Sequence, residues 1–247
     1  MKKIILLPII LQFSLYSSQI KPINGYIKQK MINGNTWRKS CPIKLKELRL
    51  IKISYIGFDN KEHLGEMIVH KSVANEVVNI FKELKQIKYP IEKIQLVSNY
   101  KGSDDLSMKN NNTSSFNCRL MTGSKTKYST HSYGKAIDIN PIQNPYVKKN
   151  VVLPKEGVNY IGANRVHLSN QADDIAIILK NDKIVKIFKK YGWMWGGDWK
   201  SLKDYQHFEK KYNPSTKNMQ KRKTPKELFK NLNIQEKNGE FFKLNSF

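Results

Sequence analysis

The sequence predicts a single α+β domain, because strand and helix patterns follow one another along 247 residues. Residues 48–58 are rich in β-forming side chains, residues 59–61 have turn chemistry, and residues 63–70 read as a return strand. Together they predict a β-hairpin. Residues 73–87 repeat apolar side chains at the 3.6-residue period of an amphipathic helix, which Pro90 ends. Hydrophobic residues make up 39% of the chain, which excludes a disordered protein.

Shorter elements complete the pattern. We expect strands at residues 94–97 and at residues 136–139, the second closed by Pro141, and a helix over residues 173–191.

The connecting segments are polar. Residues 19–42, 101–130 and 141–170 read as irregular, and long loops in a compact domain are usually functional. Beyond residue 210 the chain is basic, with one short helix expected at residues 225–232.

The start of the chain resembles a secretory signal peptide. Lys2 and Lys3 precede an apolar run at residues 4–15, and Ser17 and Ser18 offer small residues for cleavage. A membrane-spanning helix needs roughly 20 apolar residues, so this run is short for one. An uncleaved N-terminal anchor is the alternative.

The chain therefore divides into four parts. We expect a signal peptide at residues 1–18, a lead-in segment at 19–42, a main folded domain at 43–210 and a basic extension at 211–247.

The formal net charge is +24, a balance that suits polyanions such as nucleic acid or an acidic wall polymer. The charge is mostly lysine spread along the chain, and export would separate the protein from nucleic acid, so we expect no nucleic-acid partner. We expect membrane contact only through the signal segment. The sequence leaves the oligomeric state open. It also leaves open whether Cys41 and Cys118 pair, and the lack of CxxC spacing excludes a cysteine zinc site.

The first chemical motif is residues 129–141, which read Ser-Thr-His-Ser-Tyr-Gly-Lys-Ala-Ile-Asp-Ile-Asn-Pro. Asp138 lies between two isoleucines on a strand, and a bare carboxylate there is costly without a partner. A metal ion shared with His131 is one such partner. A structural hydrogen bond between His131 and Asp138 is the alternative.

The second motif is the aromatic, glycine-rich segment 192–209, which contains His207. Two histidines and a carboxylate form a known catalytic zinc set, with a fourth position left for water. A carboxylate that is not a ligand can then take the proton from that water. Asp204 suits this role, and Asp198 is the rival. Trp193, Trp195 and Trp199 are expected to pack a core or to wall the cleft.

These two motifs resemble those of the zinc D-Ala-D-Ala carboxypeptidase and L-Ala-D-Glu endopeptidase family, the LAS group. The resemblance rests on His-x6-Asp, on Asp-x-x-His and on the Gly-Trp-x-Trp-Gly-Gly-Asp-Trp run between them, and it extends over residues 55–209. It implies one Zn²⁺ per chain, held by His131, Asp138 and His207, with Asp204 as general base. It also implies a small central antiparallel sheet flanked by helices.

The family further implies an arginine that steadies an oxyanion or a substrate carboxylate. Many members carry it in Ser-x-Tyr-Arg, but residues 98–101 read Ser-Asn-Tyr-Lys. Arg119, in a Phe-Asn-Cys-Arg segment, resembles the Phe-Asn-x-Arg of one branch and is the substitute. A guanidinium fork suits either partner better than the point charge of lysine.

The function expected from this resemblance is zinc-dependent hydrolysis of a peptide bond in peptidoglycan stem peptides by metal-activated water. The bond is either L-Ala–D-Glu, for an endopeptidase, or D-Ala–D-Ala, for a carboxypeptidase. The protein would be exported to the periplasm, the cell wall or the medium. The alternative is a non-catalytic wall-binding or polyanion-binding module that keeps the peptidase fold. His63, His70 and His167 are expected to be structural or exposed.

Overall fold

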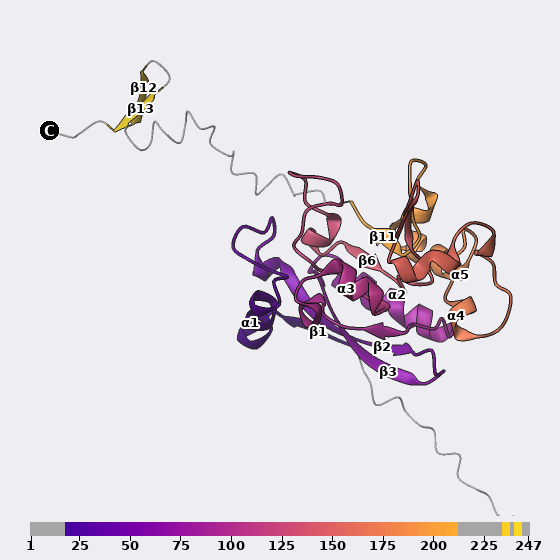
Figure 1. Cartoon of the computed structure of the whole chain (residues 1–247). Coiled ribbons are helices and arrows are strands. Elements are labelled where there is room, and N and C mark those ends of the chain that lie inside the picture. Colours follow the sequence, from indigo (N-terminus) through magenta and orange to yellow (C-terminus); the bar gives the residue numbers. More distant parts are fainter. Residues whose placement is uncertain (1–17, 212–233, 238–239, 244–247) are drawn as a thin grey trace, which may run out of the picture. The chain divides into compact units, whose positions relative to one another are not determined.

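A computed structural model describes residues 18–211, 234–237 and 240–243. The described residues up to Lys211 belong to one compact unit, and the antiparallel strands β12 (Ile234–Lys237) and β13 (Glu240–Lys243) belong to another. Helices and small, mostly antiparallel sheets alternate along the chain, so the α+β class is confirmed (Figure 1). The apolar run at 4–15 and the helix expected at 225–232 lie outside the described residues.

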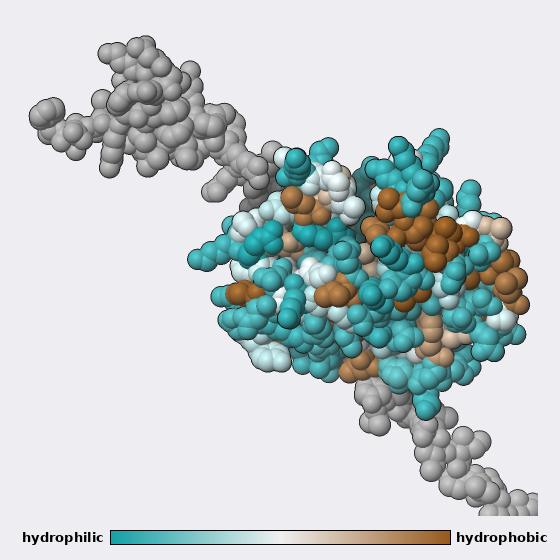
Figure 2. Space-filling model, in the orientation of Figure 1, coloured by the Kyte–Doolittle hydropathy of each residue, from teal (hydrophilic) through white to brown (hydrophobic). Residues whose placement is uncertain are grey.

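Among the described residues, no helix is both long and apolar enough to cross a membrane. Hydrophilic residues cover most of the face shown in Figure 2.

The predicted hairpin is confirmed as β2 (Leu48–Ile56) and β3 (Glu62–His70), in a register that pairs Ile53 with Gly65. Strand β1 (Gln19–Pro22) pairs with the other edge of β2, which gives a three-stranded antiparallel sheet.

Helix α2 (Ala74–Gln86) confirms the predicted amphipathic helix and crosses the hairpin in Figure 1. Its apolar stripe is buried, as the 3.6-residue period requires, through Ala74, Val77, Ile80, Phe81 and Leu84. Each large apolar side chain that is fully buried contributes about 1.5–3 kcal/mol. This stripe belongs to one hydrophobic core shared with β2, β3 and helix α5 (Lys183–Lys190).

A second antiparallel sheet has the order β6-β11-β9, from β6 (Ala136–Asp138), β11 (His207–Glu209) and β9 (Met194–Trp195). The register pairs His207 with Asp138 and Phe208 with Ile137. Side chains alternate across a strand, so Ile137 and Phe208 enter the core and Asp138 and His207 share the opposite face. This register places the second half of the chemical motif against the first.

Two smaller sheets lie beside these. Strand β7 (Tyr146–Lys148) pairs with β8 (Val151–Leu153) and with β10 (Lys203–Asp204), and Asp204 lies opposite Tyr146. Strands β4 (Lys93–Ile94) and β5 (Asn112–Thr113) form a short parallel pair.

Several segments expected to be irregular are ordered. Residues 19–42 contain β1 and helix α1 (Gly25–Asn33), whose N-cap Asn24 accepts a hydrogen bond from Ile27 N. Residues 101–130 contain helix α3 (Asp104–Lys109), capped by Ser103. Both helices begin at a short polar cap, a signal that the polarity of the surrounding segments obscured.

Residues 141–170 were also expected to be irregular. They hold β7 and β8 and two 3₁₀ helices, η4 (Lys155–Tyr160) and η5 (Gly162–Asn164).

Two predicted elements are interrupted. The strand expected at 94–97 is only the end of β4, and the 3₁₀ helix η2 (Val97–Tyr100) follows. The helix expected at 173–191 is split into α4 (Ala172–Ile175) and α5. The break occurs where Asp182 Oδ2 accepts a hydrogen bond from Leu179 N at 2.7 Å, which diverts the backbone before α5 begins.

Cys41 and Cys118 form a disulfide with Cα atoms 5.9 Å apart. It joins the segment after α1 to the segment that leads into Arg119.

Candidate metal centre and its groove

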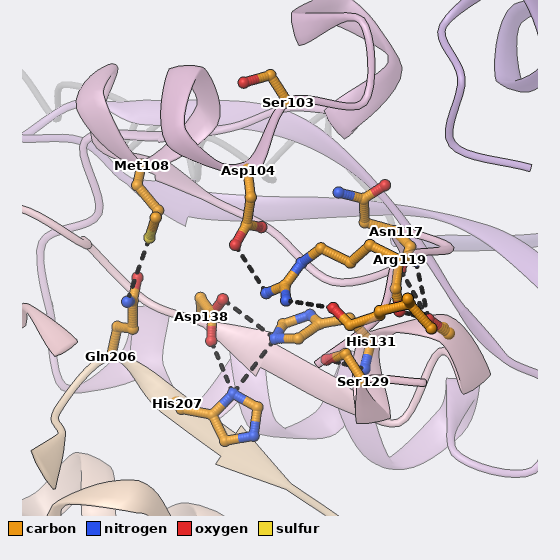
Figure 3. A network of polar contacts seen from close by, with 12 residues as sticks. Ser103, Asp104, Met108, Asn117, Arg119, Ser129, His131, Asp138, Gln206 and His207 are labelled. Carbon is orange, nitrogen blue, oxygen red and sulfur yellow. Dashed lines mark hydrogen bonds and ion pairs between the residues drawn. The ribbon is translucent and has the colours of Figure 1, made fainter. Parts of the chain in front are cut away.

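Three side chains converge on the face of the β6-β11 pair that is turned away from the hydrophobic core. His131 Nε2 lies 3.1 Å from Asp138 Oδ2, His207 Nδ1 lies 3.0 Å from Asp138 Oδ1, and the two ring nitrogens are 3.2 Å apart. Figure 3 shows the two imidazoles and the carboxylate directed at one another. All three residues are buried, so the sequence-predicted ligands are brought together.

The remaining ring nitrogens are anchored by acceptors. His131 Nδ1 lies 2.6 Å from the carbonyl of Ser115, and His207 Nε2 lies 3.3 Å from the Glu209 carboxylate. A carbonyl and a carboxylate only accept, so these nitrogens carry the protons. The lone pairs of His131 Nε2 and His207 Nδ1 therefore face Asp138 and each other. Such partners commonly orient metal-binding histidines.

This donor set fits a zinc ion. Three electron-rich atoms facing one another need a cation or an added proton between them. A tetrahedral zinc at about 2.0–2.1 Å from each ligand separates neighbouring ligand atoms by roughly 3.3 Å, close to the spacings observed here. Within residues 18–211 this is the one group of three or more such side chains whose ligand atoms all lie within 4.8 Å of one another.

The electrostatics point the same way. Burial alone would raise the pKa of Asp138, but the two neighbouring imidazoles lower that pKa well below its usual range. Burial alone would lower the pKa of His207, but hydrogen bonds to Asp138 and Glu209 raise it to about 10. The metal-free cluster thus holds a proton where a cation is favoured, and a metal ion would replace it.

The local backbone explains how His131 reaches this point. It lies in the 3₁₀ helix η3 (Thr130–Tyr133), which Ser129 caps by accepting a hydrogen bond from His131 N. Gly134 ends η3 with φ +64°, and a Cβ there would come 2.6 Å from His70 N. Glycine is therefore required for the turn that sends the chain into β6.

Asp204 lies in the same groove as the cluster, and within residues 18–211 its buried Oδ1 has no hydrogen-bond partner. Burial raises its pKa to about 6, although the positive charge of His207 opposes the rise. A Cβ on Gly196 would lie 2.5 Å from the carbonyl oxygen of Asp204, so a glycine there allows β10 to approach. A carboxylate that has an oxygen without a hydrogen-bond partner and a pKa near 6 suits a general base.

The rival Asp198 is placed differently. Its carboxylate forms an ion pair with Lys189 at 2.7 Å, and it does not line the groove. It ends the 3₁₀ helix η6 (Gly196–Asp198), in keeping with the turn expected for this sequence.

The groove that holds these residues has a volume of about 440 Å³. Its apolar wall is formed by Met108, Leu120, Met121, Leu153, Trp199 and Leu202. The ring of Trp199 lies 5.4 Å from the ring of His207. Trp199 therefore forms part of the groove wall, which is one of the two positions expected for the tryptophans. Trp193 and Trp195 are buried in the core instead.

Arg119 also lines the groove, and its guanidinium is directed at Asp104 (Figure 3). Arg119 Nη2 lies 2.7 Å from Asp104 Oδ2, and Nη1 donates to the carbonyl of Leu120 at 3.3 Å. Burial raises the pKa of Asp104 above its usual value, and the charge of Arg119 opposes this rise. The buried Nε of Arg119 has no hydrogen-bond partner among residues 18–211. Arg119 thus lines the groove while Asp104 and the carbonyl of Leu120 hold its two terminal nitrogens.

Three residues important to the site were missed from the sequence. Glu209 follows His207 by two residues on β11, so it shares the face of His207, and this period-two spacing could have revealed it. The local sequence around Asp104 gave no indication of a role, because its ion pair with Arg119 forms only in the folded structure. Arg165 donates to the carbonyls of Gln143, Tyr160 and Ile178 and stacks on Tyr205, beside Asp204, at 3.7 Å. It is a structural anchor for β10.

The other histidines lie outside the cluster. His63 contacts Asp59, His70 contacts Ser72, and His167 contacts Asp182.

An α+β fold with a buried two-histidine, one-carboxylate cluster in an open groove is typical of metal-dependent hydrolases. Residues 122–210 match the family model described as D-alanyl-D-alanine carboxypeptidase. This match confirms the resemblance to the zinc D-Ala-D-Ala carboxypeptidase family for that part of the chain and indicates a metallopeptidase. It includes the three cluster residues and Asp204, and begins just after Arg119. No solved structure matches the chain significantly.

Proposed function

We propose that this protein is an exported zinc peptidase that hydrolyses a peptide bond in the stem peptides of bacterial peptidoglycan. The observation that carries the proposal is the pairing of two features in one groove. The first is the His131, Asp138 and His207 cluster, and the second is the unpartnered carboxylate oxygen of Asp204. The family match includes the residues of both features, so one class of proteins accounts for both.

The chemistry divides among the chain's own residues. A bound zinc ion would lower the pKa of a coordinated water and polarise the scissile carbonyl. Asp204 takes the proton from the attacking water and returns it to the leaving amine. Arg119 donates to the oxygen that becomes negative, or to a nearby substrate carboxylate. His131 and His207 are held by Ser115 and Glu209 and need no rearrangement to bind the metal.

The non-catalytic alternative has less support. A wall-binding module that kept the metal for stability would have no use for Asp204. A buried carboxylate oxygen without a partner among residues 18–211 is unfavourable for folding, so its presence in the groove favours catalysis.

The test is digestion of purified muropeptides by the zinc-loaded protein, followed by mass spectrometry. Loss of a single alanine from pentapeptide stems would identify D-Ala–D-Ala cleavage. Release of stems that begin with D-Glu would identify L-Ala–D-Glu cleavage. Asp204→Asn is the matched inactive control. If the zinc-loaded protein leaves all stem peptides intact but still binds peptidoglycan, the non-catalytic alternative is correct.

Export is tested separately. We expect the mature protein to begin near Gln19 and to lie outside the cytoplasm. N-terminal sequencing of the protein from fractionated cells measures this, and an intact Met1 on the exported protein would favour the anchor.

A further inference from the structure

Cys118 lies immediately before Arg119, and all of its bonding groups are engaged by one distant segment, residues 36–41. Its sulfur is bonded to Cys41, its amide donates to the carbonyl of Thr36 at 3.0 Å, and its carbonyl accepts from Arg38 Nη1 at 3.0 Å. None of residues 36–41 lines the groove. Within this segment, the three contacts made with Cys118 are the ones that lie next to Arg119.

The backbone of Arg119 is held by the 3₁₀ helix η3, which carries His131. Arg119 N donates to Ser132 Oγ at 3.0 Å, and the carbonyl of Arg119 accepts from Ser129 N at 3.1 Å. Ser132 lies in η3 beside His131, and Ser129 caps that helix. The backbone at residues 118–119 is thus held between the segment 36–41 and the helix that carries a metal ligand.

The segment 36–41 is itself well anchored. Trp37 Nε1 donates to the carbonyl of Ile43 at 3.1 Å, and Tyr128 Oη donates to the carbonyl of Ser40 at 3.0 Å. A small rotation of the backbone at Cys118 would be amplified along the extended Arg119 side chain. A misplacement of about 1 Å at a substrate-positioning group can reduce a rate about 100-fold.

From these contacts we infer that Arg38 and the Cys41–Cys118 disulfide are positioning groups for Arg119. They hold the backbone of residue 118 so that the guanidinium lies in the groove against Asp104. This inference rests on the proposed function, since it assigns the segment a part in placing Arg119 for the substrate. Reduction of the disulfide should therefore weaken catalysis without touching the zinc ligands.

The kinetic test compares Arg38→Gln and the double variant Cys41→Ser/Cys118→Ser with the unaltered zinc-loaded protein on muropeptides. We expect kcat/KM to fall by about 10- to 100-fold in both. Zinc affinity, measured by chelator competition, should stay within about twofold, because His131, Asp138 and His207 keep their partners. Arg49→Gln is the matched control, since Arg49 also donates to two backbone carbonyls but does not line the groove. Its kinetics should be unchanged.

A second comparison, made in a protein that carries Arg119→Lys, separates a positioning role of Arg38 from a general loss of structural order. With Arg119→Lys already present, Arg38→Gln should cause little further loss, because the group that it positions is gone. An equal additional loss in that background would overturn the inference. Treatment with a phosphine reductant should lower the activity of the unaltered protein and leave the double serine variant unaffected.

A third measurement does not depend on activity. The sequence has five arginines, so nitrogen-15 arginine labelling gives few side-chain Nε signals, and Arg119→Lys assigns one of them. Reduction of the disulfide should shift or broaden the Arg119 signal and leave the Arg49 signal in place. An Arg119 signal that does not respond overturns the inference even if the protein is an active peptidase. An unaltered protein that cleaves no stem peptide overturns the proposed function, while the Arg119 signal still decides the positioning role.

Discussion

Glu209 Oε2 lies 3.3 Å from His207 Nε2 and accepts a second hydrogen bond from Thr130 Oγ1 at 2.6 Å. The carboxylate thus fixes the tautomer of a metal ligand from behind and is itself held in place. Hydrogen bonding to His207 lowers the pKa of Glu209, so it stays ionised near neutral pH.

We predict that Glu209→Gln weakens zinc binding by about 10- to 100-fold, because the amide is a poorer acceptor for the His207 proton. Chelator competition measures the affinity. Activity should return at saturating zinc, since the three zinc ligands, Asp204 and Arg119 are unchanged. Glu66→Gln, at an exposed ion pair with Lys52, is the control and should bind zinc normally. Unchanged affinity in Glu209→Gln would show that the contact does not tune the ligand.

We predict one zinc ion per chain, with His131→Ala and His207→Ala each losing both the metal and the activity. Each substitution removes one of only three protein ligands. Metal analysis after dialysis measures the stoichiometry. His63→Ala, which lies outside the cluster, should keep full occupancy. Full zinc content in the His207→Ala protein would refute the assignment.

We predict that Asp204→Asn keeps the zinc and lowers kcat by about 10²- to 10⁴-fold, the usual contribution of a general base. The amide is nearly the same size as the carboxylate but cannot accept the proton. Asp198→Asn, which breaks only the ion pair with Lys189, is the matched control and should remain active. The reverse result, with Asp198→Asn inactive and zinc-loaded, would make Asp198 the base.

We predict that kcat/KM rises as the pH increases through about 6, or somewhat below it with zinc bound. Asp204 acts as a base only when ionised, and burial raises its pKa to about 6, so protonation at lower pH removes the base. The positive charge of a bound zinc favours the carboxylate and moves this limb downward. A pH profile from about 4 to 8 measures it. A flat profile across this range would contradict the assignment of Asp204 as a titrating base.

Much of the fold could be predicted because its main elements have local signals. The hairpin β2–β3 follows from β-forming side chains on either side of turn residues, and helix α2 follows from the 3.6-residue period of its apolar side chains. The short helices α1 and α3 were missed, since each is polar outside and is held by a single cap. The break between α4 and α5 was missed because a side-chain hydrogen bond from Asp182 diverts a chain that is apolar enough to continue.

The sequence by itself determined the candidate ligands His131, Asp138 and His207 and the candidate base Asp204, since they lie in two distinctive motifs. Only the tertiary structure decided that these motifs meet, because the antiparallel register that pairs His207 with Asp138 joins segments 69 residues apart. It also decided between Asp204 and Asp198, since burial and an unsatisfied oxygen belong to the surroundings of a carboxylate and not to its motif. The pairing of Cys41 with Cys118, and with it the link from residues 36–41 to Arg119, likewise depends on distances between residues far apart in the chain. Local sequence patterns carry no information about such distances.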